Sequence, residues 1–332
     1  MKPCPTSVQA KRQRGAALLM AMLTVTLVAT LASAAQWQQW QQVNIEASER
    51  NRRQIHWLMT GALDWSRLIL REDAFATPNN GVDHLGEPWA LPIQESKLST
   101  FLSQDQKWRE GDAEVYLSGR ITDAQSRMNV MNLIENNSVS SQSLNQFAAL
   151  FDRLQLPQHE LHTLSTQLLA SIQANTRVSA QSVANRSDTS LMPHRTEQLV
   201  WLGLSPSTLD ALKEHITLLP EATPVNLNTA SAEVLSAILP GLNLAAARQA
   251  IAKRQRGHWR SLQTASQALG VLSAPLNEQS HSVQSRYFEV QGRIRIDNVA
   301  QEERILVHRS GKQVNTLWRI KTSPQLPNTL TP

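Results

Sequence analysis

Cysteine is almost absent from this chain of 332 residues. The single cysteine, Cys4, lies among the first 15 residues, so the rest of the chain can form neither a disulfide nor a thiolate metal site. Common catalytic motifs are missing too: there is no GxSxG, HExxH, Walker or GxGxxG segment. The closest helical pair of histidines, His159 and His162, lacks a clear third ligand. We therefore expect a protein that is not an enzyme.

Residues that break helices are rare near the N-terminus. No proline lies between Pro5 and Pro78, and the only glycines before Pro78 are Gly15 and Gly61. Between positions 37 and 69, apolar residues recur mostly at spacings of three, four and seven, the pattern of one helix face. This pattern predicts a single helix that continues to about Arg71 and is roughly 80 Å long.

Charge is absent from Ala16 to Ala35, an apolar run whose few polar members are threonines and a serine. Their hydroxyls can bond back to the helix backbone. About 20 residues form roughly 30 Å of helix, which matches the hydrocarbon core of a bilayer. Because Lys11, Arg12 and Arg14 precede this run, we expect a cytoplasmic N-terminus in the inner membrane and a periplasmic C-terminal domain.

Three interpretations of this junction are open from the residues. It could be a plain anchor, or an ordinary secretory signal cut near Ala32-Ser33-Ala34. It could also be a prepilin-type leader cut after Gly15, which keeps the apolar helix. The absence of a helix breaker after Ala35 favours the prepilin-type leader, since a signal peptide normally does not continue helically into the mature domain.

The segment RQRG followed by AALLMAMLTVTLVATLASA resembles the leader of a type II secretion minor pseudopilin. The whole chain resembles the general secretion pathway protein K family. The best local matches are DHLGEPWA (Asp83–Ala90), SGRITDAQSRMNVMNL (Ser118–Leu133) and PVNLNTASAEVLSAILPGL (Pro224–Leu242). The resemblance implies a pilin-like α+β fold, in which a long N-terminal helix packs on a small antiparallel sheet and a large α-helical domain is inserted.

The resemblance also implies cleavage by prepilin peptidase between Gly15 and Ala16. Lys11, Arg12 and Arg14 would hold the leader at the cytoplasmic surface. Residues 1–15 carry four basic side chains and no acidic one, so their removal would reduce the formal charge from +5 to +1. A nearly neutral mature chain gives no electrostatic argument for a nucleic-acid partner.

Met20 would be the fifth mature residue, where the resemblance implies a glutamate in most pilins. That glutamate can neutralise the terminal amine of a neighbouring subunit inside the membrane. Because an unpaired carboxylate in a membrane is costly, Met20 fits a subunit with no neighbour ahead of it. The implied function is a minor pseudopilin at the pseudopilus tip, which helps initiate assembly for export of folded proteins. The implied partners are other minor pseudopilins, the major pseudopilin, prepilin peptidase and the inner-membrane assembly platform.

The spacing of apolar residues, together with the positions of proline and glycine, predicts the order of the domains. A loop is expected over 72–95 and a strand over 112–122. Helices are expected over 139–270, with a polar loop at 174–188, and strands at Tyr287–Ile296, Arg304–His308 and Val314–Ile320. The predicted plan is a leader (1–15), a membrane-spanning and continuing pilin helix (16–71), a first β part (72–135), an inserted helical domain (136–275), closing strands (276–321) and a disordered tail (322–332).

Residues 224–271 resemble the helix-hairpin-helix module of competence-type DNA receptors, which also begins with VNxNTA. We expect a helix from Ala230 capped within Asn226–Thr229, a PGLN break, and a basic helix over Leu244–Arg256. In such modules, backbone N–H groups of a glycine-rich hairpin bind phosphate. Here Asn243 replaces the second glycine; asparagine can adopt a left-handed turn, but it hinders close phosphate approach. A packing module is therefore favoured, with a membrane-anchored DNA-uptake protein or a type IV minor pilin as the alternative.

Calcium is the only cofactor that the resemblance suggests, because members of the family can bind it. Asp123 and Asn129 follow a predicted strand and are expected first to cap a turn and start a helix. The sequence has no EF-hand pattern, and spacing alone assigns no ligands. Other oxygen donors in or near loops are Asp83, Glu87, Asp112 and Glu114.

Overall fold

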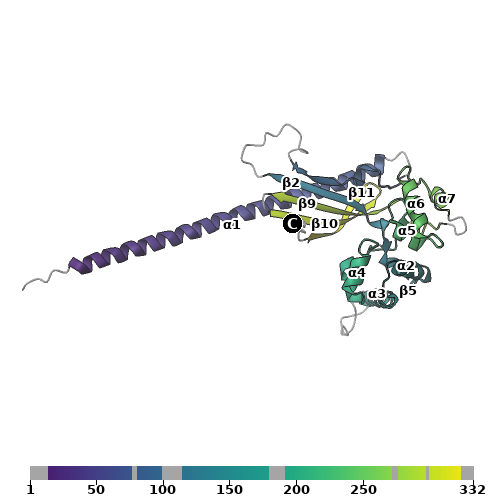
Figure 1. Cartoon of the computed structure of the whole chain (residues 1–332), viewed down its shortest axis with the longest axis horizontal. Helices are drawn as coiled ribbons and strands as arrows, with labels where there is room; N and C mark the ends of the chain where they lie inside the picture. The colour runs from purple at the N-terminus through teal and green to yellow at the C-terminus, as the bar shows by residue number, and fades with distance from the viewer. Residues whose placement is uncertain are drawn as a thin grey trace, which may run out of the picture. The chain divides into compact units, whose positions relative to one another are not determined.

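The computed structural model describes residues 14–76, 81–98, 114–178, 191–270, 276–296 and 299–322. The chain forms two units, Met1–Trp57 and Leu58–Pro332. The long helix α1, Arg14–Ala76, belongs to both (Figure 1). It extends five residues beyond the predicted end at Arg71, because the next proline after Pro5 is Pro78, which lies beyond Ala76.

In the unit Met1–Trp57, every described residue is helical. A stretch of α1 within Ala16–Phe75 has the length and mean hydropathy, 2.1, of a membrane span. Its hydroxyls bond back to the helix as predicted: the Oγ1 of Thr24 donates to the carbonyl of Ala21 at 2.9 Å, and the Oγ of Ser33 donates to the carbonyl of Ala29 at 2.9 Å. The polar side chains of this stretch are therefore satisfied without water.

The sheet in the second unit is antiparallel and has the order β1-β2-β9-β10-β11. Its strands are β1 (Ile93–Lys97), β2 (Val115–Asp123), β9 (Tyr287–Ile296), β10 (Val299–Ser310) and β11 (Gln313–Thr322). β2 pairs directly with β9, so the long segment between these two strands is an insertion, as predicted (Figure 1). β1 was not predicted, because Ile93–Lys97 lies in a proline-rich segment and its pairing with β2 overrides its weak strand pattern.

The C-terminal part of α1 packs on this sheet through Met59, Leu63 and Leu70, which are all buried. Two glycines, Gly119 and Gly292, lie opposite each other in the β2–β9 pair. A Cβ added at Gly292 would lie 3.1 Å from the sulfur of Met59. The glycine therefore lets the helix and the sheet approach closely.

The insertion is mainly helical and has its own core, which includes Phe147, Phe151, Leu161 and Leu235. Its helices are α2 (Ser141–Arg153), α3 (Gln158–Val178), η5 (Thr196–Leu202), α4 (Pro206–Leu212), α5 (Ala232–Ile238), α6 (Leu244–Arg254) and α7 (Leu262–Leu269). Short strand pairs link its edges: β3 (Met128–Asn129) with β6 (Ile216–Thr217), β4 (Ile134–Glu135) with β5 (Ser138–Val139), and β7 (Val225–Asn226) with β8 (His281–Ser282). The predicted loop 174–188 is wrong at its start, because α3 continues to Val178; the rest of that loop, and the predicted tail beyond Thr322, lie outside the described residues.

Candidate functional site at the domain junction

Asp123 is the centre of the junction between the sheet and the insertion. One carboxylate oxygen accepts a hydrogen bond from the backbone N–H of Gln125 at 2.7 Å, which caps the short helix η3 (Ala124–Ser126) as predicted. The other oxygen accepts from the hydroxyl of Ser285 (2.6 Å), the hydroxyl of Thr229 (2.6 Å) and the amide of Asn226 (3.0 Å). Burial raises the pKa of Asp123, and these four donors oppose that rise. The carboxylate thus ties β2 to segments about 100 and 160 residues away.

Asn129 has a parallel role six residues further along the chain. Its side chain caps η4 (Val130–Leu133) by accepting from the N–H of Met131 at 3.1 Å, again as predicted. The same amide donates to the carbonyl of Glu221 at 2.7 Å and to the hydroxyl of Thr223 at 3.1 Å. Asp123 and Asn129 are therefore structural residues that join distant segments, and their oxygens are already engaged within the chain.

The asparagines of the VNLNTA segment do not cap α5, which corrects the predicted cap. Ser231 is the N-cap of α5 and accepts from the N–H of Val234. Asn226 instead donates to the backbone carbonyl of Asp83 at 3.1 Å, and Asn228 exchanges two hydrogen bonds of 2.9 Å with the backbone of Trp259. This segment resembles a DNA-binding hairpin in sequence, but its polar side chains hold the junction together.

Two of the basic residues of α6, Arg248 and Arg254, contact other groups within the chain. Arg254 is 7% exposed and donates to the backbone carbonyls of Leu227 and Ala230, with its guanidinium 5.9 Å from the Trp259 ring. Burial lowers the pKa of Arg254 to about 10. Arg248 lies 3.7 Å from Glu233. Arg254 therefore cannot serve as a surface phosphate contact, which removes one of the expected cations.

The hairpin between α5 and α6 differs from the prediction at Asn243. Gly241 takes the left-handed conformation, with φ of 83°. Asn243 has φ of −80° and is the N-cap of α6, where its side chain accepts from the N–H of Ala246 at 2.8 Å. The asparagine that replaces the second glycine therefore stabilises the helix start, and its side-chain oxygen occupies the helix N–H group that a phosphate would need.

Three carboxylates meet near the end of α1: Asp73, Asp83 and Glu87 each place one oxygen within 4.8 Å of the others. Two of these residues, Asp83 and Glu87, are calcium candidates from the sequence. Burial raises the pKa of Asp83 to about 7, against the opposing charge of Arg309. Arg309 makes ion pairs with both aspartates. A cation is thus already bound in this cluster, and the set does not fit calcium while Arg309 is in place.

Among the described residues, Glu114 is a further calcium candidate from the sequence, and it is not part of this cluster. Glu114 is exposed and bonds to Lys97 and Tyr116. Asp112 lies outside the described residues. His159 and His162 lie on an exposed helix face. Trp89, by contrast, is 2% exposed: its indole N–H donates to Glu87 at 2.7 Å, and its ring packs edge-on against Phe288.

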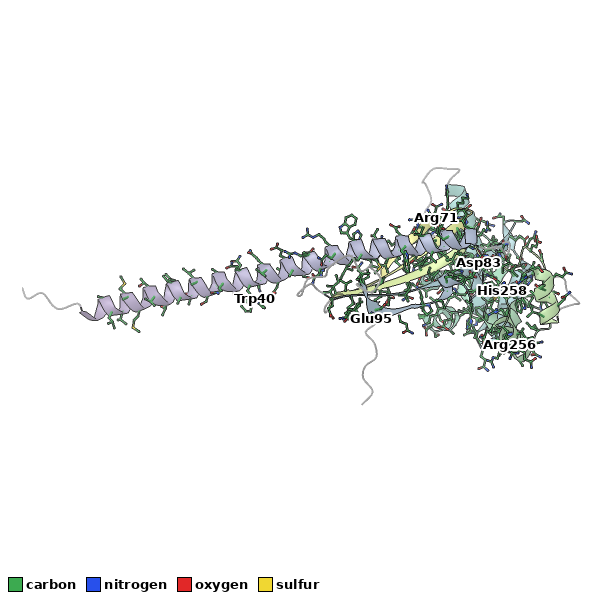
Figure 2. The ribbon with its side chains drawn as sticks, turned by 90° about the horizontal axis from the view of Figure 1, so that it is seen from above. Trp40, Arg71, Asp83, Glu95, Arg256 and His258 are labelled. Carbon is green, nitrogen blue, oxygen red and sulfur yellow. The ribbon has the colours of Figure 1, made fainter. Side chains whose placement is uncertain are left out.

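Two histidines also meet at the junction. The rings of His84 and His258 stack with centroids 3.7 Å apart and an interplanar angle of 12°. Burial lowers the pKa of both imidazoles. His258 lowers the pKa of His84 further, and Arg260 lowers the pKa of His258 further. Figure 2 shows His258 and Asp83 at the same end of the second unit. This contact joins the loop after α1 to the loop between α6 and α7.

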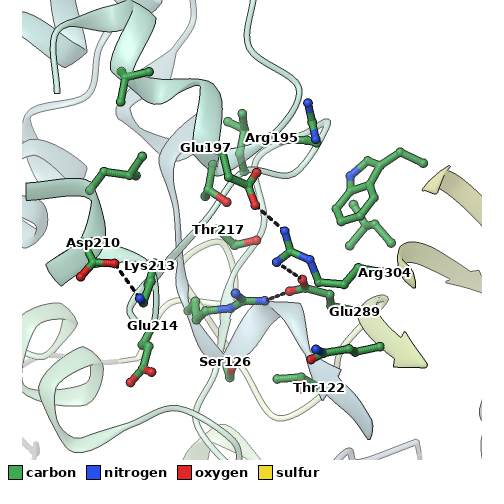
Figure 3. Close-up of a pocket in the computed structure, with 18 of the residues that line it drawn as sticks. Thr122, Ser126, Arg195, Glu197, Asp210, Lys213, Glu214, Thr217, Glu289 and Arg304 are labelled. Atoms are coloured by element: carbon green, nitrogen blue, oxygen red, sulfur yellow. Dashed lines mark hydrogen bonds and ion pairs between the residues drawn. The ribbon is translucent and has the colours of Figure 1, made fainter. Parts of the chain in front are cut away.

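A cavity of about 560 Å³ lies between η5, α4 and the face of the sheet that carries Arg120, Thr122 and Gln291. Figure 3 shows Arg304 between Glu197 of the insertion and Glu289 of β9. Arg127 adds a second ion pair to Glu289 at 2.7 Å. The charged groups that line this cavity are thus largely paired with one another, and their chain of ion pairs attaches η5 to the sheet.

Sequence reasoning missed Arg309, Asp73 and Ser285. Arg309 lies on β10 shortly after the apolar run Ile305–Val307. Nothing in the residues around it predicts that its charged side chain is buried. Asp73 lies on α1, beyond the end that was predicted at Arg71. A signal that could have found them is the requirement that a buried carboxylate such as Asp83 needs a cation from some other segment.

The predicted processing site lies at the start of α1. Lys11 and Arg12 precede the described residues, and Arg14, Gly15 and Ala16 lie in the first turn. Met20 follows on the same helix and is exposed. Cleavage after Gly15 stays a prediction.

The fold defines a class of protein. A helix that contains a membrane-span-like stretch and continues onto a small antiparallel sheet is the architecture of a pilin-like subunit, here with a helical insertion. The family description "Type II secretion system (T2SS), protein K" matches residues 225–284, and its first-domain counterpart matches residues 126–221. Over these two segments the chain is similar to type II secretion system protein K.

Relatives and a solved structure agree with this assignment. Type II secretion system protein K of Pseudomonas aeruginosa is 26% identical over 296 residues, which cover 84% of this chain and 83% of that protein. The protein of the same name from Klebsiella pneumoniae is 25% identical and covers 93% of this chain and 96% of its own length. The crystal structure of the GspK-GspI-GspJ complex from enterotoxigenic Escherichia coli contains a chain of the same fold, with a TM-score of 0.61, 18% identity, and coverage of 83% of this chain and 99% of that chain. The predicted α+β fold and the predicted resemblance to protein K are confirmed.

Proposed function

We propose that this protein is the minor pseudopilin that caps the tip of a type II secretion pseudopilus and helps initiate its assembly. One observation carries the tip position. The insertion leaves the sheet where β2 ends at Asp123 and β9 begins at Tyr287. At the same end of the sheet, Arg309 of β10 forms an ion pair with Asp73, which lies near the C-terminus of α1. A bulky domain at this end occupies the space that a subunit stacked above would need.

The proposed partners follow from the same architecture. The solved relative of the same fold is in a complex with GspI and GspJ. We infer that this chain likewise assembles with two or more minor pseudopilins, and then with the major pseudopilin, through α1. The inner-membrane assembly platform would receive this complex. The role is structural, and the protein is not an enzyme.

We infer an inner-membrane location with a cytoplasmic leader and a periplasmic second unit. Basic residues before Ala16 and an uncharged run after it support this orientation. Trp37 and Trp40 follow the run, are exposed, and lie with ring centroids 5.4 Å apart. Paired tryptophans just beyond an apolar span suit the membrane–water interface on the periplasmic side.

The first test is the mature N-terminus, measured by mass spectrometry with and without a co-expressed prepilin peptidase. We expect Ala16 as the first residue only when the peptidase is present, and an uncut chain for Gly15→Leu. A start at Ala35 would instead indicate an ordinary secreted domain.

The tip position needs a separate test. Isolated pseudopili can be labelled with an antibody against the second unit and examined by electron microscopy. We expect label at one end of each filament. Label at regular intervals along the filament would contradict the capping role while leaving leader processing intact.

A further inference from the structure

The carboxylate cluster at the end of α1 has an unusual charge balance. Asp73, Asp83 and Glu87 come from a helix and the loop that follows it, and one oxygen of each lies within 4.8 Å of the others. Asp83 and Glu87 are buried. Carboxylates this close and this poorly solvated repel one another, so the cluster needs a cation.

Arg309 supplies that cation from β10. Its Nη1 donates to the carboxylate of Asp73 at 3.0 Å and lies 3.5 Å from the carbonyl of Leu70. Its Nη2 donates to the carboxylate of Asp83 and, at 2.9 Å, to the carbonyl of Ser285. The guanidinium also lies 4.7 Å from the centre of the Phe288 ring. The cation therefore has oxygen atoms around it and an aromatic face on one side.

These oxygens are of the kind that calcium prefers. Calcium takes roughly six to eight oxygen ligands, commonly carboxylates and backbone carbonyls. Three carboxylates and the carbonyls of Leu70 and Ser285 surround the guanidinium or lie beside it. An ion at ordinary calcium–oxygen distances from Asp73 and Asp83 would overlap the Arg309 side chain, so the two cations are mutually exclusive.

We propose that the guanidinium of Arg309 is the built-in cation of an oxygen-lined site, so that this junction folds without calcium and becomes a calcium site only when Arg309 is removed. Burial raises the pKa values of Asp73, Asp83 and Glu87, and the positive charge of Arg309 opposes that rise at each of the three carboxylates. The inference does not depend on the proposed tip position.

The test compares full-length protein in detergent with the variant Arg309→Met, which keeps an unbranched apolar side chain but removes the guanidinium and its charge. For the wild type we expect the same melting temperature in chelator and in millimolar calcium. For Arg309→Met we expect a lower melting temperature in chelator and recovery of stability in calcium. Arg295→Met, which removes an arginine paired with Glu95 elsewhere on the sheet, is the matched control and should show no calcium response.

Terbium luminescence gives a readout of binding that is separate from stability. The indole of Trp89 lies 2.7 Å from Glu87 and can sensitise a lanthanide bound in the cluster. We expect sensitised emission from Arg309→Met, weak emission from the wild type, and loss of the signal in the double variant Arg309→Met/Glu87→Gln. If Arg309→Met does not fold in chelator, its refolding in calcium supports the proposal and its failure to refold contradicts it.

Two other outcomes would overturn the proposal. One is a wild-type melting temperature that rises with calcium and loses that rise in Asp83→Asn, since calcium would then bind beside Arg309. The other is a folded Arg309→Met protein that binds neither calcium nor terbium, since the cluster would then not form a cation site.

Discussion

Asp123 accepts a hydrogen bond from the hydroxyl of Thr229 at 2.6 Å, although 106 residues separate them in the chain. Asp123 ends β2, whereas Thr229 lies in the insertion just before α5. Ser285, which precedes β9, donates to the same carboxylate oxygen. One buried carboxylate therefore joins the insertion to both strands between which it is inserted, and these strands form the centre of the pilin-like sheet.

Replacing Asp123 with alanine should destabilise the second unit strongly. The change leaves the hydroxyls of Thr229 and Ser285 and the amide of Asn226 without their buried acceptor. Because each unsatisfied buried group costs about 1–3 kcal/mol, we expect a loss of at least about 3 kcal/mol in the free energy of unfolding. Urea denaturation followed by tryptophan fluorescence measures this. Thr229→Val removes a single donor and should cost about 1.5 kcal/mol. Equal, small effects of both variants would contradict the central role of Asp123.

Arg254 and its neighbour Lys253 should behave differently although both are basic residues of α6. Arg254→Met loses the hydrogen bonds to Leu227 and Ala230, so we expect a decrease of about 2 kcal/mol in stability. Lys253→Glu alters an exposed side chain and should change stability by less than about 0.5 kcal/mol. A gel-shift titration with duplex DNA at low salt provides the second readout. We expect no shift for the wild type; a salt-sensitive shift that Lys253→Glu abolishes would restore the DNA-binding alternative.

Gly292 should tolerate no branched side chain, because α1 packs directly over it. A Cβ there would lie 3.1 Å from the Met59 sulfur and 3.9 Å from Leu63, and valine adds two further methyl groups. We expect Gly292→Val to lower stability by about 1–3 kcal/mol. Gly257→Ala is the control, since nothing lies within 4 Å of its added Cβ. A Gly292→Val protein with wild-type stability and normal protease resistance of α1 would show that the helix is not tightly packed here.

The uncharged side chain of Met20, where most pilins have a glutamate, is one of the reasons for proposing the tip position. In a subunit at the proposed tip, a glutamate there would place a carboxylate in the membrane with no neighbouring amine ahead of it. We expect Met20→Glu to reduce pseudopilus assembly and secretion of a reporter exoprotein, whereas Met20→Gln, of similar size but uncharged, should secrete normally. Normal secretion by Met20→Glu would leave the tip argument resting on the inserted domain alone.

The long helix, the split sheet and the helical insertion could be predicted from the sequence because each depends on local periodicity or on the absence of breakers. Alternation identified Tyr287–Ile296 and the β10–β11 hairpin, and Asp123 and Asn129 were correctly predicted as caps. These signals lie within a few residues of one another in the chain.

The junction itself could not be predicted, since its contacts join residues far apart in sequence. Arg309 and Asp83 are separated by 226 positions, and neither has a local pattern that requires the other. The resemblance of VNLNTA to a DNA-binding hairpin was misleading for a related reason. Two helices, α5 and α6, follow this segment as expected, but Asn226 and Asn228 are used by tertiary contacts that only the folded chain creates.

Asp83 should give the junction a distinctive pH dependence. Burial raises its pKa from 3.8 to about 7, so between these values the folded protein holds a proton that the unfolded chain releases. Its contribution to stability is therefore greatest at low pH and is lost as the pH rises towards 7. His84, His258 and His281 act in the opposite direction, because burial lowers their pKa values and protonation below about pH 6.5 favours the unfolded state.

Asp83→Asn separates these opposing effects, because the three histidines are present in both proteins. Asparagine keeps an oxygen that can accept from the N–H of Ser285 but does not titrate. We expect the free energy of unfolding of the wild type, minus that of Asp83→Asn, to fall by up to about 4 kcal/mol as the pH rises from 4 to 7, and to be constant above pH 7. Urea denaturation at each pH gives this difference. A difference that increases with pH would mean that the ion pair with Arg309 outweighs burial and keeps Asp83 ionised throughout this range.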